Sequence, residues 1–171
     1  MSSKQMPATL DAFYAHVLGL EYECEHRLID LSRTLDAHHN PEAAEIFAKA
    51  EKMRADNIRR INLLCEDLEL PRIAPWDYYW HQYVNIESLC IDSIHYMITA
   101  FEAVELVLKK LDAARDFYRE IANASELPAI QEAAEGIIEL LESEIETVRG
   151  WQSGHEAQSP PADLDPPHQP E

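Results

Sequence analysis

The chain has 171 residues and a formal net charge of −18, with 32 acidic residues against 14 basic ones. This balance argues against nucleic-acid binding and against an anionic membrane surface, because both need clustered Lys and Arg. The length predicts one domain, with a core that needs neither disulfides nor metal for stability. No apolar run is long enough to span a bilayer and no early stretch has the pattern of a secretory signal, so we expect a cytoplasmic protein without membrane contact.

Residue usage favours long helices and reduced thiols. Only 4 glycines accompany 46% hydrophobic residues, which is typical of helical rather than turn-rich proteins. Cys24, Cys65 and Cys90 are an odd number at scattered spacing without a CxxC motif. This pattern indicates buried or free thiols in a reducing compartment rather than a disulfide framework or a zinc site.

The first half of the chain predicts a helical hairpin over residues 9–69. Apolar residues recur at three- and four-residue steps over residues 9–37, and the same spacing resumes after Pro41. The turn His38-His39-Asn40 separates the two helices. Asn40 can cap the second helix and Pro41 suits its first position, where a missing N–H costs nothing. The two adjacent histidines point apart, so we interpret them as turn residues rather than ligands.

Residues 70–92 follow as a connection rich in proline and aromatic residues. In a bundle of two hairpins this segment has to carry the chain the length of the bundle. Its aromatic side chains can pack it against the helices, which is the simpler interpretation. The alternative is that they form an interaction surface for a partner; the residues in question are Trp76, Tyr78, Tyr79, Trp80 and Tyr83.

The second half repeats the pattern of the first. Residues 93–151 predict a second hairpin, whose later helix opens at Pro128 as the earlier one opens at Pro41. We therefore expect an all-α four-helix bundle over residues 1–151, built from two antiparallel hairpins and a long crossover. Residues 152–171 are acidic and proline-rich, which is typical of a disordered tail.

Four segments together resemble a known family. They read AHHNPEAAEIF (residues 37–47), LELPRIAPWDYYW (68–80), IHYMITAFEAVEL (94–106) and DPPHQPE (165–171). They are similar to the rubrerythrin-type branch of the ferritin-like superfamily, in the group that lacks a rubredoxin domain. The resemblance implies a di-iron centre that reduces peroxide or oxidises iron. Its ligands would be one Glu in the first and third helices and Glu-x-x-His in the second and fourth.

Most of the implied ligands are replaced in this chain. Aligning the two hairpins at their turn prolines places Arg54 and Asn57 at the ligand positions of the second helix, and Leu141 and Glu144 at those of the fourth. Matching the ends of the preceding helices places Glu21 and Leu111 at the other two positions. Only Glu21 keeps the residue of the family, and Glu144 keeps only the ability to bind a cation. The resemblance with these departures predicts a degenerate centre without a cofactor. The alternative is iron or another single ion held by Glu21, Glu144 and Asp112.

Arg54 decides between these alternatives. Its guanidinium has five donors, no lone pair and a permanent positive charge, so it repels a metal ion from a ligand position. We expect Glu21, Arg54 and Glu144 to form a buried charge cluster, with Asn57 satisfying remaining lone pairs. In the other interpretation Arg54 reaches the surface and Glu21 is solvated.

Two classes of function follow from the resemblance. The first is a binding or structural protein without a di-iron centre and without catalytic residues, associating with itself as a homodimer or with a related ferritin-like protein as a hetero-oligomer. The second is a metal-dependent oxidoreductase of the rubrerythrin type. The lost ligands favour the first class.

Overall fold

The computed structural model describes residues 5–154. Within this range the chain forms four long helices and no strand: α1 (Leu10–Ala37), α2 (Pro41–Leu64), α3 (Ala100–Ala124) and α4 (Pro128–Ser153). The predicted all-α four-helix bundle is confirmed. Residues 155–171, which hold most of the predicted tail, lie outside the described residues, and Gln152 and Ser153 belong to α4 instead.

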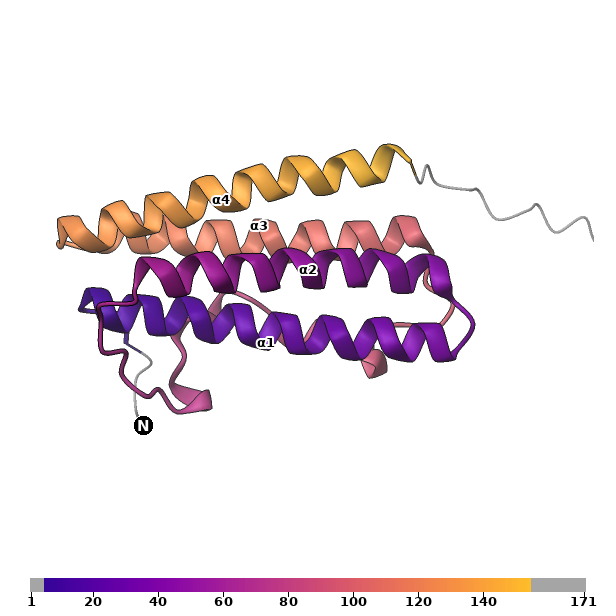
Figure 1. The fold of residues 1–171 in the computed structure, drawn as a ribbon, viewed down its shortest axis with the longest axis horizontal. Helices are drawn as coiled ribbons and strands as arrows, with labels where there is room; N and C mark the ends of the chain where they lie inside the picture. Colours follow the sequence, from indigo (N-terminus) through magenta and orange to yellow (C-terminus); the bar gives the residue numbers. More distant parts are fainter. Residues whose placement is uncertain (1–4, 155–171) are drawn as a thin grey trace, which may run out of the picture.

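The helices pair as two hairpins, α1 with α2 and α3 with α4 (Figure 1). Within each hairpin the helices are antiparallel, whereas α2 and α3 run in the same direction because the crossover returns the chain to the other end of the bundle. The hairpins also contact each other, α2 with α3 and α1 with α4. An edge-to-face contact joins α1 to α3, with the rings of Phe13 and Tyr118 centred 6.1 Å apart.

Local sequence signals fix where the helices begin. Thr9 and Asn40 cap α1 and α2 through side-chain oxygens that accept from the amides of Ala12 and Ala43. Pro41 and Pro128 occupy the first positions of α2 and α4, where proline is already set for the helix. At the first turn His39 takes a φ of 60°, in the left-handed region that ends a helix.

The third helix begins later than predicted, at Ala100 rather than near residue 93. Thr99 and Glu102 form a capping box: the Thr99 hydroxyl accepts from the Glu102 amide at 3.1 Å, and the Glu102 carboxylate accepts from the Thr99 amide at 2.8 Å. The second helix also ends early, at Leu64 rather than near residue 69. The crossover therefore spans residues 65–99 and includes His95 and Tyr96, which we had expected in the helix.

The crossover is packed on the bundle through four short 3₁₀ turns, Pro75–Asp77, Tyr79–Gln82, Ile86–Ser88 and Ile91–Ser93. Its buried side chains are Cys65, Trp80, Val84, Ile86, Leu89 and Ile94. The ring of Tyr78 stacks on Trp80 at 5.2 Å and covers Gly19 of α1. Asn40 ties the far end of the crossover to the first turn by donating to the carbonyl of Ile98 at 2.7 Å.

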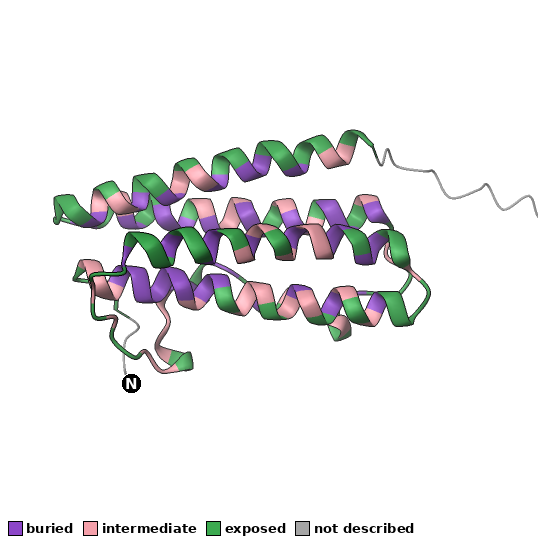
Figure 2. Cartoon of the chain, viewed as in Figure 1, coloured by how far each residue is buried: buried purple, intermediate pink, exposed green. Residues whose placement is uncertain are grey.

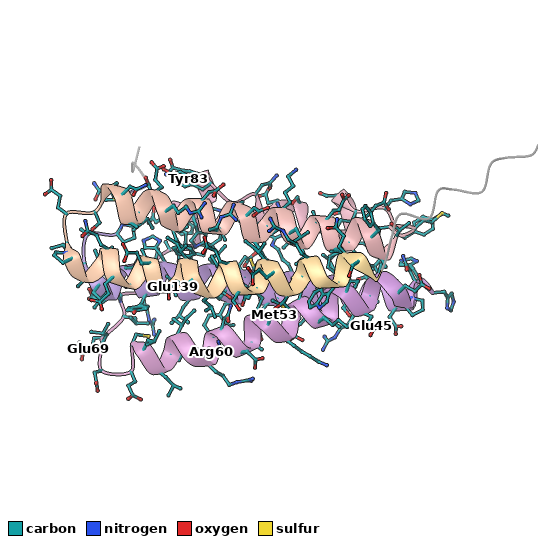
Figure 3. All side chains as sticks on the ribbon, turned by 90° about the horizontal axis from the view of Figure 1, so that it is seen from above. Glu45, Met53, Arg60, Glu69, Tyr83 and Glu139 are labelled. Carbon is teal, nitrogen blue, oxygen red and sulfur yellow. The ribbon has the colours of Figure 1, made fainter. Side chains whose placement is uncertain are left out.

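Buried residues recur along one side of α2, α3 and α4, whereas residues 13–18 of α1 are all buried, where the crossover also packs on that helix (Figure 2). Fully buried aromatic side chains from α1, α2 and α3 fill the centre, and each stabilises the fold by about 1.5–3 kcal/mol on burial; they are Phe13, Phe47, Phe117 and Tyr118. Charged residues such as Glu45, Arg60 and Glu139 lie on the outer faces (Figure 3). A group of four charged or amide side chains that are buried together in mid-bundle marks the candidate site.

Candidate functional site

Four polar side chains are buried together in the middle of the bundle. Glu21 comes from α1, Arg54 and Asn57 from α2, and Glu144 from α4, each between 3% and 7% exposed. They face inward because each lies on the apolar stripe of its helix. Arg54, for example, lies four residues after Ala50 and four before Ile58, both buried.

Arg54 lies between the two carboxylates. Its Nη1 donates to both oxygens of Glu21 at 3.1 Å, and its Nη2 donates to Oε2 of Glu144. Asn57 donates from Nδ2 to the other oxygen of Glu144. These charge-assisted bonds connect three helices through one guanidinium. We refer to Glu21, Arg54, Asn57 and Glu144 as the charge cluster.

The cluster holds two acids and one base away from water. Burial raises the pKa of Glu21 above its ordinary value, while the charge of Arg54 and a hydrogen bond from Asn57 oppose that rise. Burial also raises the pKa of the neighbouring Tyr118 well above its ordinary value, and Glu21 adds to the effect. Within the described part of the chain the Tyr118 hydroxyl has no hydrogen-bond partner.

The other two positions implied by the resemblance are apolar. Leu111 on α3 and Leu141 on α4 are 5% and 1% exposed, and Leu111 lines the same small cavity as Glu21 and Arg54. The structure therefore places all six positions in the interior, and four of them form the cluster. Neither leucine has an atom that can bind a metal ion.

Asp112 does not join this group. Its side chain is 42% exposed and pairs with Arg115 one turn further along α3, at 3.0 Å. The trio of Glu21, Glu144 and Asp112 is therefore not brought together. Over residues 5–154, no group of three or more His, Cys, Asp or Glu side chains has the geometry to hold a metal ion.

The crossover aromatics separate into two kinds. Trp76 is 72% exposed and Tyr83 36%, whereas Tyr78 and Tyr79 are half-buried. Trp80 is 2% exposed, so its place in the predicted interaction surface is wrong: it packs under Tyr78 and fills the space between crossover and bundle. Of the five aromatic residues predicted for the interaction surface, only Trp76 and Tyr83 present much surface to a partner.

Three buried polar residues outside the cluster were missed by the sequence analysis, and two of them, His16 and Lys110, bind the crossover. His16 on α1 accepts from the Tyr79 amide through Nδ1 at 3.4 Å, and burial lowers its pKa to about 4. Lys110 on α3 donates from Nζ to the Asn85 carbonyl of the crossover. Both lie on the apolar stripe of their helix, four residues before Leu20 and Ala114 respectively, and this spacing was the available signal.

The histidines at the surface include His26, His38 and His95. His26 pairs with Asp30 at 3.6 Å on an exposed face of α1. His38 packs its ring against Tyr96 at 5.9 Å, and His95 accepts from the Met97 amide. None of them reaches the charge cluster.

Comparison with known proteins supports the fold and leaves the family open. No family model matches the chain, and no curated protein does. A solved structure of an uncharacterized conserved protein from Magnetospirillum magnetotacticum MS-1 is similar, with a TM-score of 0.65 and 22% identity over 89% of this chain and 99% of that one. No helix in residues 5–154 is long and apolar enough to cross a membrane.

Proposed function

We propose that this chain is a ferritin-like protein of the rubrerythrin type that has exchanged its metal centre for a salt-bridged cluster and acts as a binding or structural protein. The observation that carries the proposal is the position of Arg54, whose guanidinium lies between Glu21 and Glu144 at the centre of the bundle. A cation bound to both carboxylates would have to occupy the same space.

The chemistry of the donor set supports this proposal. Two iron ions carry at least four positive charges, which carboxylates neutralise and imidazoles complete. The six relevant positions supply two carboxylates, one amide, two aliphatic side chains and one guanidinium. Because Arg keeps its charge at every accessible pH and has no lone pair, these residues do not fit a di-iron centre.

The cluster instead suits a structural role. Removing one partner from a buried charge network leaves the other charges with neither a partner nor solvent, which is costly. A complete network therefore holds the helices in one arrangement. Here Glu144 is bonded to both Arg54 and Asn57, which links α4 to the first hairpin. The positions of the former metal ligands thereby hold the two hairpins together.

We further propose that the chain works in the cytoplasm through its surface, as a homodimer or with a related ferritin-like protein. Three free cysteines fit a reducing compartment. Trp76 is the most exposed large apolar side chain of the crossover, and exposed aromatic residues are enriched at interfaces. An oligomer would be detected by light scattering, and Trp76→Ser should weaken it if the crossover is the interface.

Metal analysis of protein purified from its own cell tests the main proposal. We expect far less than one iron, manganese or zinc ion per chain, and no turnover of peroxide or oxidation of ferrous iron above the buffer control. Two bound irons together with peroxide turnover would overturn the proposal and establish the oxidoreductase alternative.

A further inference from the structure

A small cavity lies beside the charge cluster and is lined by α1, α2, α3 and the crossover. Its volume is about 30 Å³, and its wall is mostly aliphatic, including Leu20, Leu28, Val84 and Val107. One probe sphere of water needs about 10–15 Å³ of such space, so the cavity accommodates a molecule of two or three heavy atoms. Four side chains with polar atoms also line it, namely Glu21, Arg54, Cys24 and Lys110.

Three of these four groups are already engaged or inert. Glu21 and Arg54 bond to each other at 3.1 Å. Burial raises the pKa of Cys24 to about 12, so its sulfur stays a thiol, which is a poor nucleophile. Lys110 is the remaining polar group of the wall.

The amine of Lys110 is buried without a counter-ion. The residue is 9% exposed, and none of the ion pairs found over residues 5–154 includes it. Its hydrogen bond goes to a neutral carbonyl, that of Asn85. Burial lowers the pKa of this amine. A lysine desolvated beside an apolar pocket is the environment in which the amine attacks carbonyl carbons. Its neighbour Lys109 is exposed and provides an internal comparison.

We propose that the cavity admits a one- or two-carbon aldehyde, which condenses reversibly with Lys110 to form an imine. The Nζ lone pair attacks the carbonyl carbon and a C–N bond forms. The carbonyl oxygen then leaves as water with the two hydrogens of the amine, so no oxidant or reductant is needed. This site goes beyond the interaction role and does not depend on it.

Reductive trapping tests the proposal directly on the full-length protein. Acetaldehyde and cyanoborohydride at pH 7 convert each imine to a stable ethylamine, and peptide mass spectrometry gives the rate at every lysine. We expect Lys110 to be ethylated faster than Lys109, because burial lowers the pKa of the Lys110 amine and leaves more of it unprotonated at pH 7. Hexanal is too large for the cavity, so it should modify Lys110 no faster than Lys109. Acetaldehyde should likewise show no preference for Lys110 when the protein is unfolded in denaturant.

Two variants test the contributions of the amine and of the cavity separately. Lys110→Met should remove the fast ethylation and leave the rate at Lys109 unchanged. Ala114→Leu places a larger side chain on the cavity wall and should slow Lys110 alone. The proposal is overturned if Lys110 reacts no faster than Lys109 in the native protein, or if hexanal shows the same preference as acetaldehyde. Both of these results come from the unmodified protein, so they stand even where a variant fails to fold.

Discussion

Nη1 of Arg54 lies 3.1 Å from both carboxylate oxygens of Glu21, which joins α2 to α1 in the interior of the first hairpin. The other amino group of the same guanidinium reaches Glu144 on α4. One side chain thus satisfies acids from both hairpins. The stability of the bundle should therefore depend on Arg54 far more than on any surface ion pair.

Replacing Arg54 by Ala should lower the free energy of unfolding by about 3–5 kcal/mol, because it leaves two carboxylates buried without a cation. Combining Arg54→Leu with Glu21→Gln and Glu144→Gln should recover much of this loss, since the stranded charges are then gone. Chemical denaturation measures both values.

Arg59 on the same helix provides the matched control. It also pairs with an acid, Asp56, but both side chains are more than half exposed. Arg59→Ala should change stability by about 1 kcal/mol or less, as exposed pairs do. Equal losses for the two Arg→Ala variants would show that the cluster contributes no more than a surface pair.

Rebuilding the implied ligand set should create iron binding. The substitutions are Arg54→Glu, Asn57→His, Leu111→Glu, Leu141→Glu and Glu144→His, which complete a set with Glu21. We expect about two irons per chain, the occupancy of a carboxylate di-iron bundle. Metal analysis and the visible absorption of the ferric form measure it.

The control for this experiment keeps Arg54 and carries the other four substitutions. Its retained guanidinium should hold iron binding near the level of the parent. If the complete variant folds, as judged by circular dichroism, and still binds no iron, the alignment of the two hairpins that assigns these positions is wrong.

His16 should make the fold sensitive to acid. The unfolded chain binds a proton at this residue near pH 6.5, whereas the folded chain does so only near pH 4, because burial lowers the pKa. Stability is therefore complete above pH 6.5, falls as the pH drops from 6.5 to 4, and loses about 3 kcal/mol in total. Protonation also removes the Nδ1 lone pair that accepts the hydrogen bond from the Tyr79 amide.

The denaturation midpoint measured from pH 7 to pH 4 checks this expectation. His16→Gln should flatten the profile in that window, because the amide carries no titrating proton. His26→Gln, which changes an exposed histidine of the same helix, should leave the profile unchanged. A His16→Gln profile as steep as that of the parent would assign the acid sensitivity to other groups.

Two helical glycines should respond differently to alanine. Nothing lies within 4 Å of a Cβ added at Gly136, so Gly136→Ala should stabilise α4 by about 1 kcal/mol. A Cβ at Gly19 would meet the Tyr78 ring at 2.3 Å. Moving that ring off the crossover should cost about 1–3 kcal/mol, which cancels or exceeds the same helical gain. Thermal melts of the two variants compare them directly.

The fold was predictable because its signals are local and periodic. The apolar stripes, the caps at Thr9 and Asn40, and the prolines at residues 41 and 128 each specify part of a helix in sequence alone. The late start of α3 was also readable, since Thr99 and Glu102 have the spacing of a capping box. We missed it because apolar residues continue upstream of Ala100, where they pack the crossover instead of a helix.

The sequence by itself determined the four-helix bundle and the positions facing its axis, because helical periodicity sets which side of each helix is buried. Only the tertiary structure decided what those positions do. No local pattern specifies the distances between helices. These distances decide whether Arg54 reaches Glu21 or the surface, whether Trp80 is exposed and whether Asp112 turns inward. The packing of the helices also sets the free-energy cost of charging His16, Lys110 and the acids of the charge cluster. This cost comes from desolvation, which depends on what surrounds a group in space rather than along the chain.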